Sequence, residues 1–245
     1  MKQNSNTDSG QGNSYNDTII DQVGTYCHNV QKIENNIYTS PSSPSDDKLT
    51  IKWHVSHNAV GVINLLKKAR KHVVLHAAFY PKYAHDEMGA EIEERLKTNS
   101  DFTLTVIHTC TKKNSWLPEF VKILRRSFTV GKFKQELNGN LKHFRQLQAN
   151  YPGQVEITSC SKLPLFPVVL VDNTIVVGHY AHSVTNAPCG LWLSIHHPLI
   201  AEVYDMVRQH KPIGGIFSSP EQLAILRYIE ELALTEANLE DAISN

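Results

Sequence analysis

The sequence predicts an α/β protein built on one mixed, mostly parallel sheet with helices on both faces. Apolar runs of strand length recur along the chain, and amphipathic helical patterns lie between them. Hydrophobic residues make up 41% of the chain and charged residues 20%, which is ordinary for a globule with a buried core. Because strands that alternate with helices are usually joined by crossovers, we expect a sheet that is covered on both sides.

Six apolar runs have the length and the β-branched content of strands. Most are too apolar to lie at a sheet edge, so we expect them to be buried on both faces. The last two are separated by a short polar turn, which predicts a hairpin. The six runs are residues 50–55, 72–80, 102–109, 154–160, 166–172 and 174–178.

Between and after these runs, apolar residues recur three or four positions apart, as on one face of a helix. Five such stripes predict five helices. They are Ile63, Leu66 and Ala69; Met88, Ile92 and Leu96; Leu117, Phe120, Val121 and Leu124; Leu137, Leu141, Phe144 and Leu147; and Leu199, Val203, Met206 and Val207.

Composition divides the chain into three parts. Residues 1–48 are polar and hold only isolated apolar residues, so we expect a disordered tail. Residues 49–211 form the α/β domain. Residues 212–245 are a hinge and an acidic amphipathic helix, which Ser219, Pro220 and Gln222 begin with a capping box. Its apolar stripe either packs back on the domain or binds a protein partner through 219–238.

Several classes of protein are disfavoured by composition. Twenty-four Lys and Arg balance 24 Asp and Glu, so the chain as a whole does not attract nucleic acid or membrane. Four scattered cysteines form no CxxC pair, and we predict neither a metal nor a cofactor. No apolar run is long enough to span a membrane, and the first residues have no secretory signal, which predicts a cytoplasmic protein with no membrane partner.

Four of the 13 histidines are the candidates for catalysis. His179 and His182 follow the last apolar run, while His76 and His108 lie within two of the earlier runs. If the strands bring them to one cleft, they can act as acid, base or nucleophile. The alternative is that each histidine is buried or exposed for structural reasons alone.

The segment LPLFPVVLVDNTIVVGHYAHS, together with the order of strands and helices before it, resembles one unit of the phospholipase D family. The resemblance covers roughly residues 49 to 208. It implies one copy of a unit that the family often uses in pairs, and therefore a homodimer. The family's catalytic hairpin reads HxKxxxxD, followed by apolar residues and a Gly-Ser pair.

The hairpin of this chain keeps only part of that motif. Asp172 and Gly178 match the family's Asp and Gly, whereas Leu165 stands at the position of the His and Pro167 at that of the Lys. The resemblance implies that the His is the nucleophile and that the Lys stabilises phosphoryl oxygens, which Leu and Pro cannot do. Asp172 followed by Asn173 is also typical of a tight turn, and Gly178 also suits close packing.

A basic segment provides the candidates for anion binding. From residue 112 to 145 the chain has nine basic residues and only two acidic ones. Trp116, Phe128 and Phe133 are interleaved with them, a combination compatible with phosphate contacts and base stacking. A solvated helix face and core aromatics are the alternative. The candidates are Lys112, Lys113, Lys122, Arg125, Arg126, Lys132 and Lys134.

Three functions follow from these patterns. The first is a non-catalytic phospholipase D-like binding or regulatory module for nucleic acid or another phosphate-bearing ligand. The second is a phosphodiesterase or nuclease that uses a non-standard histidine cluster. The third is a protein-interaction module that acts through oligomerisation. The missing His and Lys favour the first, so we expect a protein that is not an enzyme.

Overall fold

The computed structural model describes residues 35–39, 49–76, 81–111, 114–183, 187–213, 215–217 and 219–241. Within those ranges it describes side chains from 49 to 233, apart from that of Ala187. The predictions that fall on residues 1–34, 40–48, 77–80, 112–113 and 242–245 lie outside the described residues.

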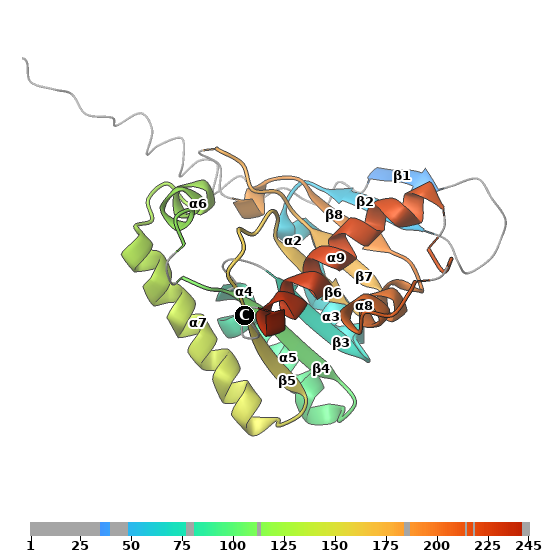
Figure 1. The fold of residues 1–245 in the computed structure, drawn as a ribbon, viewed down its shortest axis with the longest axis horizontal. Helices are drawn as coiled ribbons and strands as arrows, with labels where there is room; N and C mark the ends of the chain where they lie inside the picture. Colours follow the sequence, from blue (N-terminus) through green and yellow to red (C-terminus); the bar gives the residue numbers. More distant parts are fainter. Residues whose placement is uncertain are drawn as a thin grey trace, which may run out of the picture.

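Eight strands form one sheet in the order β1-β2-β8-β7-β6-β3-β4-β5 (Figure 1). The α/β class with a mixed sheet is therefore confirmed. The strands are β1 (Asn35–Thr39), β2 (Thr50–His54), β3 (His72–His76), β4 (Thr103–Thr109), β5 (Val155–Cys160), β6 (Val168–Val171), β7 (Thr174–Val177) and β8 (Trp192–His196).

The expectation of a mostly parallel sheet is wrong. Only β3 with β4 and β4 with β5 pair in parallel, and the other neighbours are antiparallel. One of the antiparallel pairs follows directly from its connection. The two-residue turn of Asp172 and Asn173 joins β6 to β7, and so short a turn can only join antiparallel strands.

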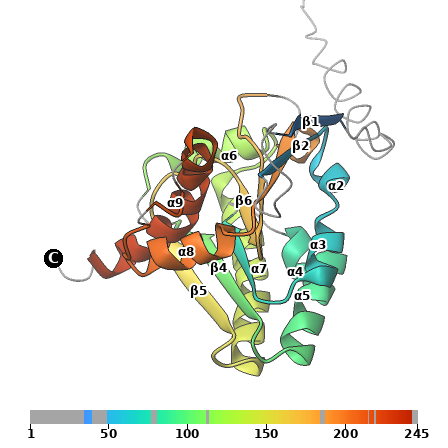
Figure 2. The same ribbon diagram turned by 90° about the vertical axis from the view of Figure 1, so that its right-hand side faces the viewer.

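Helices cover both faces of the sheet, as predicted (Figure 2). One face packs against α3, α5, α6 and α7, and the other packs against α8 and α9. The helices are α2 (His57–Val60), α3 (Val62–Lys68), α4 (Pro81–His85), α5 (Glu87–Thr98), α6 (Leu117–Leu124), α7 (Val130–Asn150), α8 (Ile200–Arg208) and α9 (Pro220–Asp241).

The last helix, α9, begins at the capping box that the sequence indicates. The backbone N–H of Gln222 donates to Ser219 Oγ at 3.2 Å, and the Ser219 N–H donates to Gln222 Oε1 at 3.1 Å. Ile225, Ile229 and Leu232 are at most 2% exposed, because α9 packs on α8 and on the sheet (Figure 1). The apolar stripe of α9 is thus part of the core of this chain.

Two strands do not correspond to the predicted runs. β1 lies within the segment that we expected to be a tail, and it pairs with β2. β8 was not among the predicted runs, because its residues have no clear alternation of apolar and polar side chains. It lies between β2 and β7. No helix in the described part of the chain combines the length and the apolar character needed to cross a membrane.

Candidate functional site

The candidate site lies where several strand ends meet. The last residue of β3, His76, pairs with the first of β6, Val168. Next to them β7 ends where β8 begins, and the end of β2 pairs with Trp192 of β8. Since ligands of α/β proteins usually bind beyond strand ends, this edge of the sheet is the natural place for a site.

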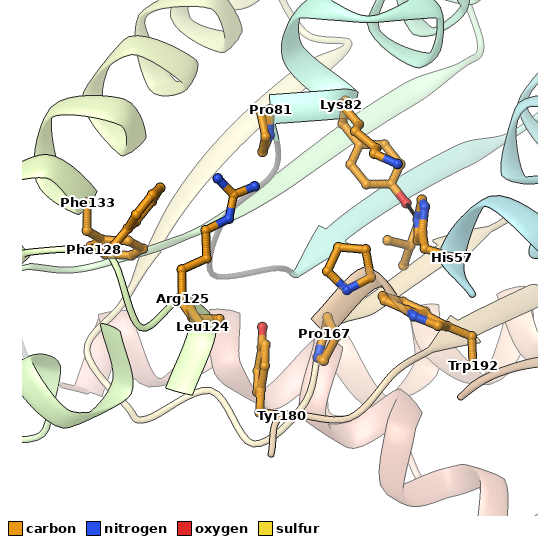
Figure 3. Close-up of a pocket in the computed structure, with 13 residues that line it drawn as sticks. His57, Pro81, Lys82, Leu124, Arg125, Phe128, Phe133, Pro167, Tyr180 and Trp192 are labelled. Atoms are coloured by element: carbon orange, nitrogen blue, oxygen red, sulfur yellow. Dashed lines mark hydrogen bonds between the residues drawn. The ribbon is translucent and has the colours of Figure 1, made fainter. Parts of the chain in front are cut away.

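A pocket of about 120 Å³ opens at this edge (Figure 3). Side chains from segments far apart in the sequence line it, on the same side of the sheet as α3, α5 and α7. Its polar lining consists of His57, Lys82, Tyr83, Arg125 and Tyr180, and its apolar lining of Pro81, Leu124, Phe128, Phe133, Pro167, Val169, Pro188 and Trp192.

Two cations and no carboxylate are among the described residues that line the pocket. Figure 3 shows Lys82 beside His57 on one side and Arg125 beside Phe128 on the other. The guanidinium carbon of Arg125 lies 4.9 Å from the centre of the Phe128 ring, and Lys82 Nζ donates to Asn58 Oδ1. The pocket is therefore electropositive with apolar walls.

His57 is held firmly but is not placed to react. Its Nε2 forms a 2.7 Å hydrogen bond with the Tyr83 hydroxyl, and its ring lies edge-on to Trp192 at 4.7 Å. Burial, with Lys82 nearby, lowers the pKa of His57 to about 4, so it is neutral at pH 7. Its Nδ1 is buried and has no partner among the described residues. Neither nitrogen is available to a ligand in this arrangement.

Trp192 rests directly on Gly178. A Cβ atom at Gly178 would lie 2.8 Å from two carbons of the indole ring, which is closer than real contacts allow. The backbone N–H of Gly178 also donates to the Pro167 carbonyl at 3.0 Å. The glycine that matches the phospholipase D motif thus permits the close packing that the sequence suggested, and it positions one wall of the pocket.

The positions of the family's His and Lys are also close to this edge. Pro167, at the position of the Lys, lines the pocket. Leu165, at the position of the His, is 60% exposed, and its backbone forms a hydrogen bond with the carboxylate of Glu231 on α9. Neither side chain supplies a nucleophile or a charge.

Asp172 lies at the opposite end of β6, in the turn that leads to β7. Its φ is 46°, a left-handed value that Asp tolerates better than most residues. Its carboxylate accepts backbone N–H groups from Arg70, Lys71 and His72 at 2.8, 2.9 and 3.0 Å. Through these three hydrogen bonds, Asp172 connects the turn between β6 and β7 to the start of β3.

The four candidate histidines are not brought together. His76 follows Val74 on the face covered by α8 and α9, whereas His108 shares the opposite face with Val106. His179 and His182 are exposed in the segment after β7, and His182 Nδ1 lies 3.9 Å from Glu119. Among the described residues, no three His, Cys, Asp or Glu side chains are grouped to hold a metal.

His76 is enclosed beneath α9. It is 2% exposed, and its Nδ1 lies 4.0 Å from a carboxylate oxygen of Glu231. Burial lowers the pKa of His76 to about 4 and raises the pKa of Glu231. Burial and, to a lesser extent, Arg145 also lower the pKa of His108.

The basic candidates occupy different places around α6 and α7. Arg125 lines the pocket, and Lys132 Nζ lies 5.0 Å from the centre of the Phe128 ring. Lys122, Arg126 and Lys132 are exposed, and Lys134 is half-buried. Lys112 and Lys113 lie outside the described residues. Of the interleaved aromatics, Phe133 is fully buried and Phe128 nearly so, while Trp116 is half-buried.

Sequence reasoning found Arg125 and the Pro167 and Gly178 positions but missed most of the pocket lining. His57, Lys82, Tyr83, Tyr180 and Trp192 have no common spacing. The available signal was indirect: Tyr180 and Trp192 flank the end of the hairpin region in the sequence. Only the meeting of strand ends brings these residues together.

No family model and no curated protein matches this chain. The phosphatidylserine synthase of Haemophilus influenzae Rd KW20 is similar over 66% of this chain, with 16% identity and a TM-score of 0.43. TrmBL2, an archaeal chromatin protein with a novel mode of DNA binding, is similar over 77%, with 11% identity and a TM-score of 0.38.

This chain spans 39% of the length of the synthase and 55% of that of TrmBL2. At these TM-scores, neither likeness carries an argument about the family or the function of this chain.

Proposed function

We propose that this chain is a non-catalytic, phospholipase D-like binding module that takes a phosphate-bearing ligand in the pocket at the strand ends. The observation that carries the proposal is the presence of both Lys82 and Arg125 in one partly enclosed pocket whose described lining has no carboxylate. The aromatic and proline side chains around them suit an organic group attached to the phosphate.

Electrostatics favours this ligand class. A phosphate brought between two cations makes charge-assisted hydrogen bonds, which are stronger than those between neutral groups. Low-polarity walls such as Phe128 and Trp192 reduce the screening of this attraction by water. The volume of about 120 Å³ suits a phosphate together with part of the group that bears it.

Binding is favoured over catalysis because the described lining of the pocket has no carboxylate, no thiol and no histidine with an available nitrogen. Leu165 and Pro167 replace the reactive pair of the family, and both nitrogens of His57 are engaged or buried. A phosphodiesterase that uses His76, His108, His179 and His182 stays a prediction with less support, because His76 and His108 lie on opposite faces of the sheet and His179 and His182 are exposed after β7. Oligomerisation as the main function, and the homodimer itself, also stay predictions.

Calorimetric titration with phenyl phosphate tests the site. Arg125→Gln and Lys82→Gln each remove a cation but keep much of the side chain. We expect each to weaken binding by roughly tenfold or more, the equivalent of about 1.5 to 3 kcal/mol for a hydrogen bond to a charged group. Arg126→Gln is the matched control, since Arg126 is exposed and does not line the pocket.

Equal affinity in Arg125→Gln, Lys82→Gln and the unchanged protein contradicts the proposal, as does a failure of the unchanged protein to bind phenyl phosphate. Cleavage of a generic phosphodiester is followed in the same samples. Activity that disappears in His179→Ala would establish the histidine-based enzyme in place of the binding module.

A further inference from the structure

Resting on the proposed phosphate site, we propose that its ligand is the phosphorylated end of a nucleic-acid strand. The terminal phosphate occupies the pocket, and a basic rim beside it contacts the following phosphates. The basic rim consists of Lys122, Arg126 and Lys132, which are all exposed.

Phe128 connects the pocket to the basic rim. Arg125 lies 4.9 Å from the centre of the Phe128 ring and faces the pocket, while Lys132 lies 5.0 Å from the same centre and is exposed. Both cations are therefore fixed against one nearly buried ring. Their closeness places a second positive charge within reach of the next phosphate of a strand whose end is held by Arg125.

The charge around the rim is suited to a polyanion. Between residues 114 and 134, Glu119 is the only acidic residue, against five Lys and Arg. The Glu119 carboxylate lies 3.8 Å from Lys122 Nζ, which offsets part of its charge, and 3.9 Å from His182 Nδ1. A local basic surface of this kind is the electrostatic footprint of nucleic-acid binding, even in a chain with no net charge.

A row of aromatic rings leads away from the pocket. Tyr180 lines the pocket and lies edge-on to Phe120 at 5.1 Å, and Phe120 lies edge-on to Trp116 at 5.5 Å. Tyr180 and Trp116 are half-buried, so part of each remains accessible to solvent. Unpaired bases stack on such rings with little regard to sequence, which favours a single strand.

The size of the pocket favours a strand end over its interior. Pro81, Pro167 and Pro188 contribute to walls around only about 120 Å³. A phosphate inside a strand carries a nucleoside on both sides, and both would have to leave through the same opening. A terminal phosphate carries only one nucleoside, so only one chain of the ligand has to leave through the opening.

The test uses the full chain and short single-stranded DNA with a 5′-phosphate, a 3′-phosphate or hydroxyls at both ends. Fluorescence anisotropy is measured over a range of salt concentrations. We expect one phosphorylated strand to bind at least about tenfold more tightly than the hydroxyl strand, a preference that Arg125→Gln abolishes. A blunt duplex with the same phosphorylated end should bind more weakly.

Lys132→Gln separates the rim from the pocket. It should weaken binding of the phosphorylated strand and reduce the salt dependence by about one counterion, while phenyl phosphate binds as before. Lys142→Gln is the matched control: Lys142 is exposed on the same helix but lies about 15 Å further along it, and its loss should change neither ligand.

The outcomes distinguish the two proposals. If phenyl phosphate binds and depends on Arg125 while all strands bind equally or not at all, the strand-end proposal is overturned and the phosphate site stands. If the duplex binds as well as the single strand, the preference for single strands is overturned. If neither phenyl phosphate nor a phosphorylated strand binds, both proposals fail.

Discussion

At the scale of single residues, the pocket depends on a position that has no side chain. Gly178 ends the hairpin of β6 and β7, and the indole of Trp192 occupies the space where a Cβ would be. Trp192 in turn contacts the ring of His57, and His57 Nε2 is hydrogen-bonded to the Tyr83 hydroxyl. The position of this wall of the pocket therefore depends on successive contacts from Gly178 through Trp192 and His57 to Tyr83.

Gly178→Ala should disturb this chain of contacts. Because the new methyl group meets the indole at 2.8 Å, Trp192 must move or the strand end must shift. We expect a loss of about 1 to 3 kcal/mol in the free energy of unfolding, a change in tryptophan fluorescence and weaker binding of phenyl phosphate.

Gly139→Ala is the control for that substitution. Gly139 lies within α7, and nothing lies within 4 Å of the Cβ that the substitution adds. It should stabilise the protein by up to about 1 kcal/mol, since alanine is the better helix former. Equal stability of the two variants in urea unfolding, with unchanged fluorescence, would show that Trp192 does not depend on Gly178.

At the scale of elements, α9 is a structural part of the domain. Its capping box fixes where it begins, and Ile225, Ile229 and Leu232 bury one side of it against α8 and the sheet. The same helix places Glu231 over His76 and the backbone of Leu165. A partner that binds residues 219–238 must therefore use the outer face of the helix, where Leu223 is 49% exposed.

Ile229→Ala should destabilise the protein by about 2 to 5 kcal/mol, because the side chain is fully buried and its loss leaves a cavity. Leu223→Ala, in the same helix but exposed, should change the free energy of unfolding by no more than about 0.5 kcal/mol. Urea unfolding measures both. Equal destabilisation by Leu223→Ala and Ile229→Ala would contradict the packing of α9 on the domain through Ile229.

At the scale of the whole molecule, neutral histidines are buried on both sides of the sheet. His57 lies on the side of the pocket and His76 on the side of α9, and burial lowers the pKa of each to about 4. The pKa values of His72, His108 and His143 are also lowered, mainly by burial. The folded chain therefore resists protonation that the unfolded chain accepts.

This arrangement predicts a loss of stability in mild acid. Below the unfolded pKa of 6.5 the unfolded state binds more protons, so the free energy of unfolding should fall from pH 6.5 toward pH 4. Each fully buried histidine contributes at most about 1.4 kcal/mol per pH unit. Glu231 acts in the opposite direction, because its raised pKa favours the folded state as the pH falls.

Urea unfolding at pH 7 and pH 5 measures this dependence. His76→Met removes one buried titrating group and should make the decline shallower, whereas His179→Gln, at an exposed position, should leave it unchanged. Stability that is constant between the two pH values would contradict the burial of neutral histidines.

Local patterns in the sequence determined most of the elements. The apolar runs predicted β2 to β7, and the stripes predicted α3, α5, α6, α7 and α8. Ser219 and Gln222 predicted the start of α9, and Asp172 with Asn173 predicted a turn. These predictions are correct because helix periodicity, caps and turns depend on interactions between residues a few positions apart.

Pairing and the pocket were decided only by the tertiary structure. β8 enters the middle of the sheet by contacts with β2 and β7, and His76 and His108 reach opposite faces through the register of their strands. Lys82, on α4, and Arg125, just after α6, line one pocket although they are far apart in the sequence. Such contacts depend on the packing of the whole chain, and no local spacing records them.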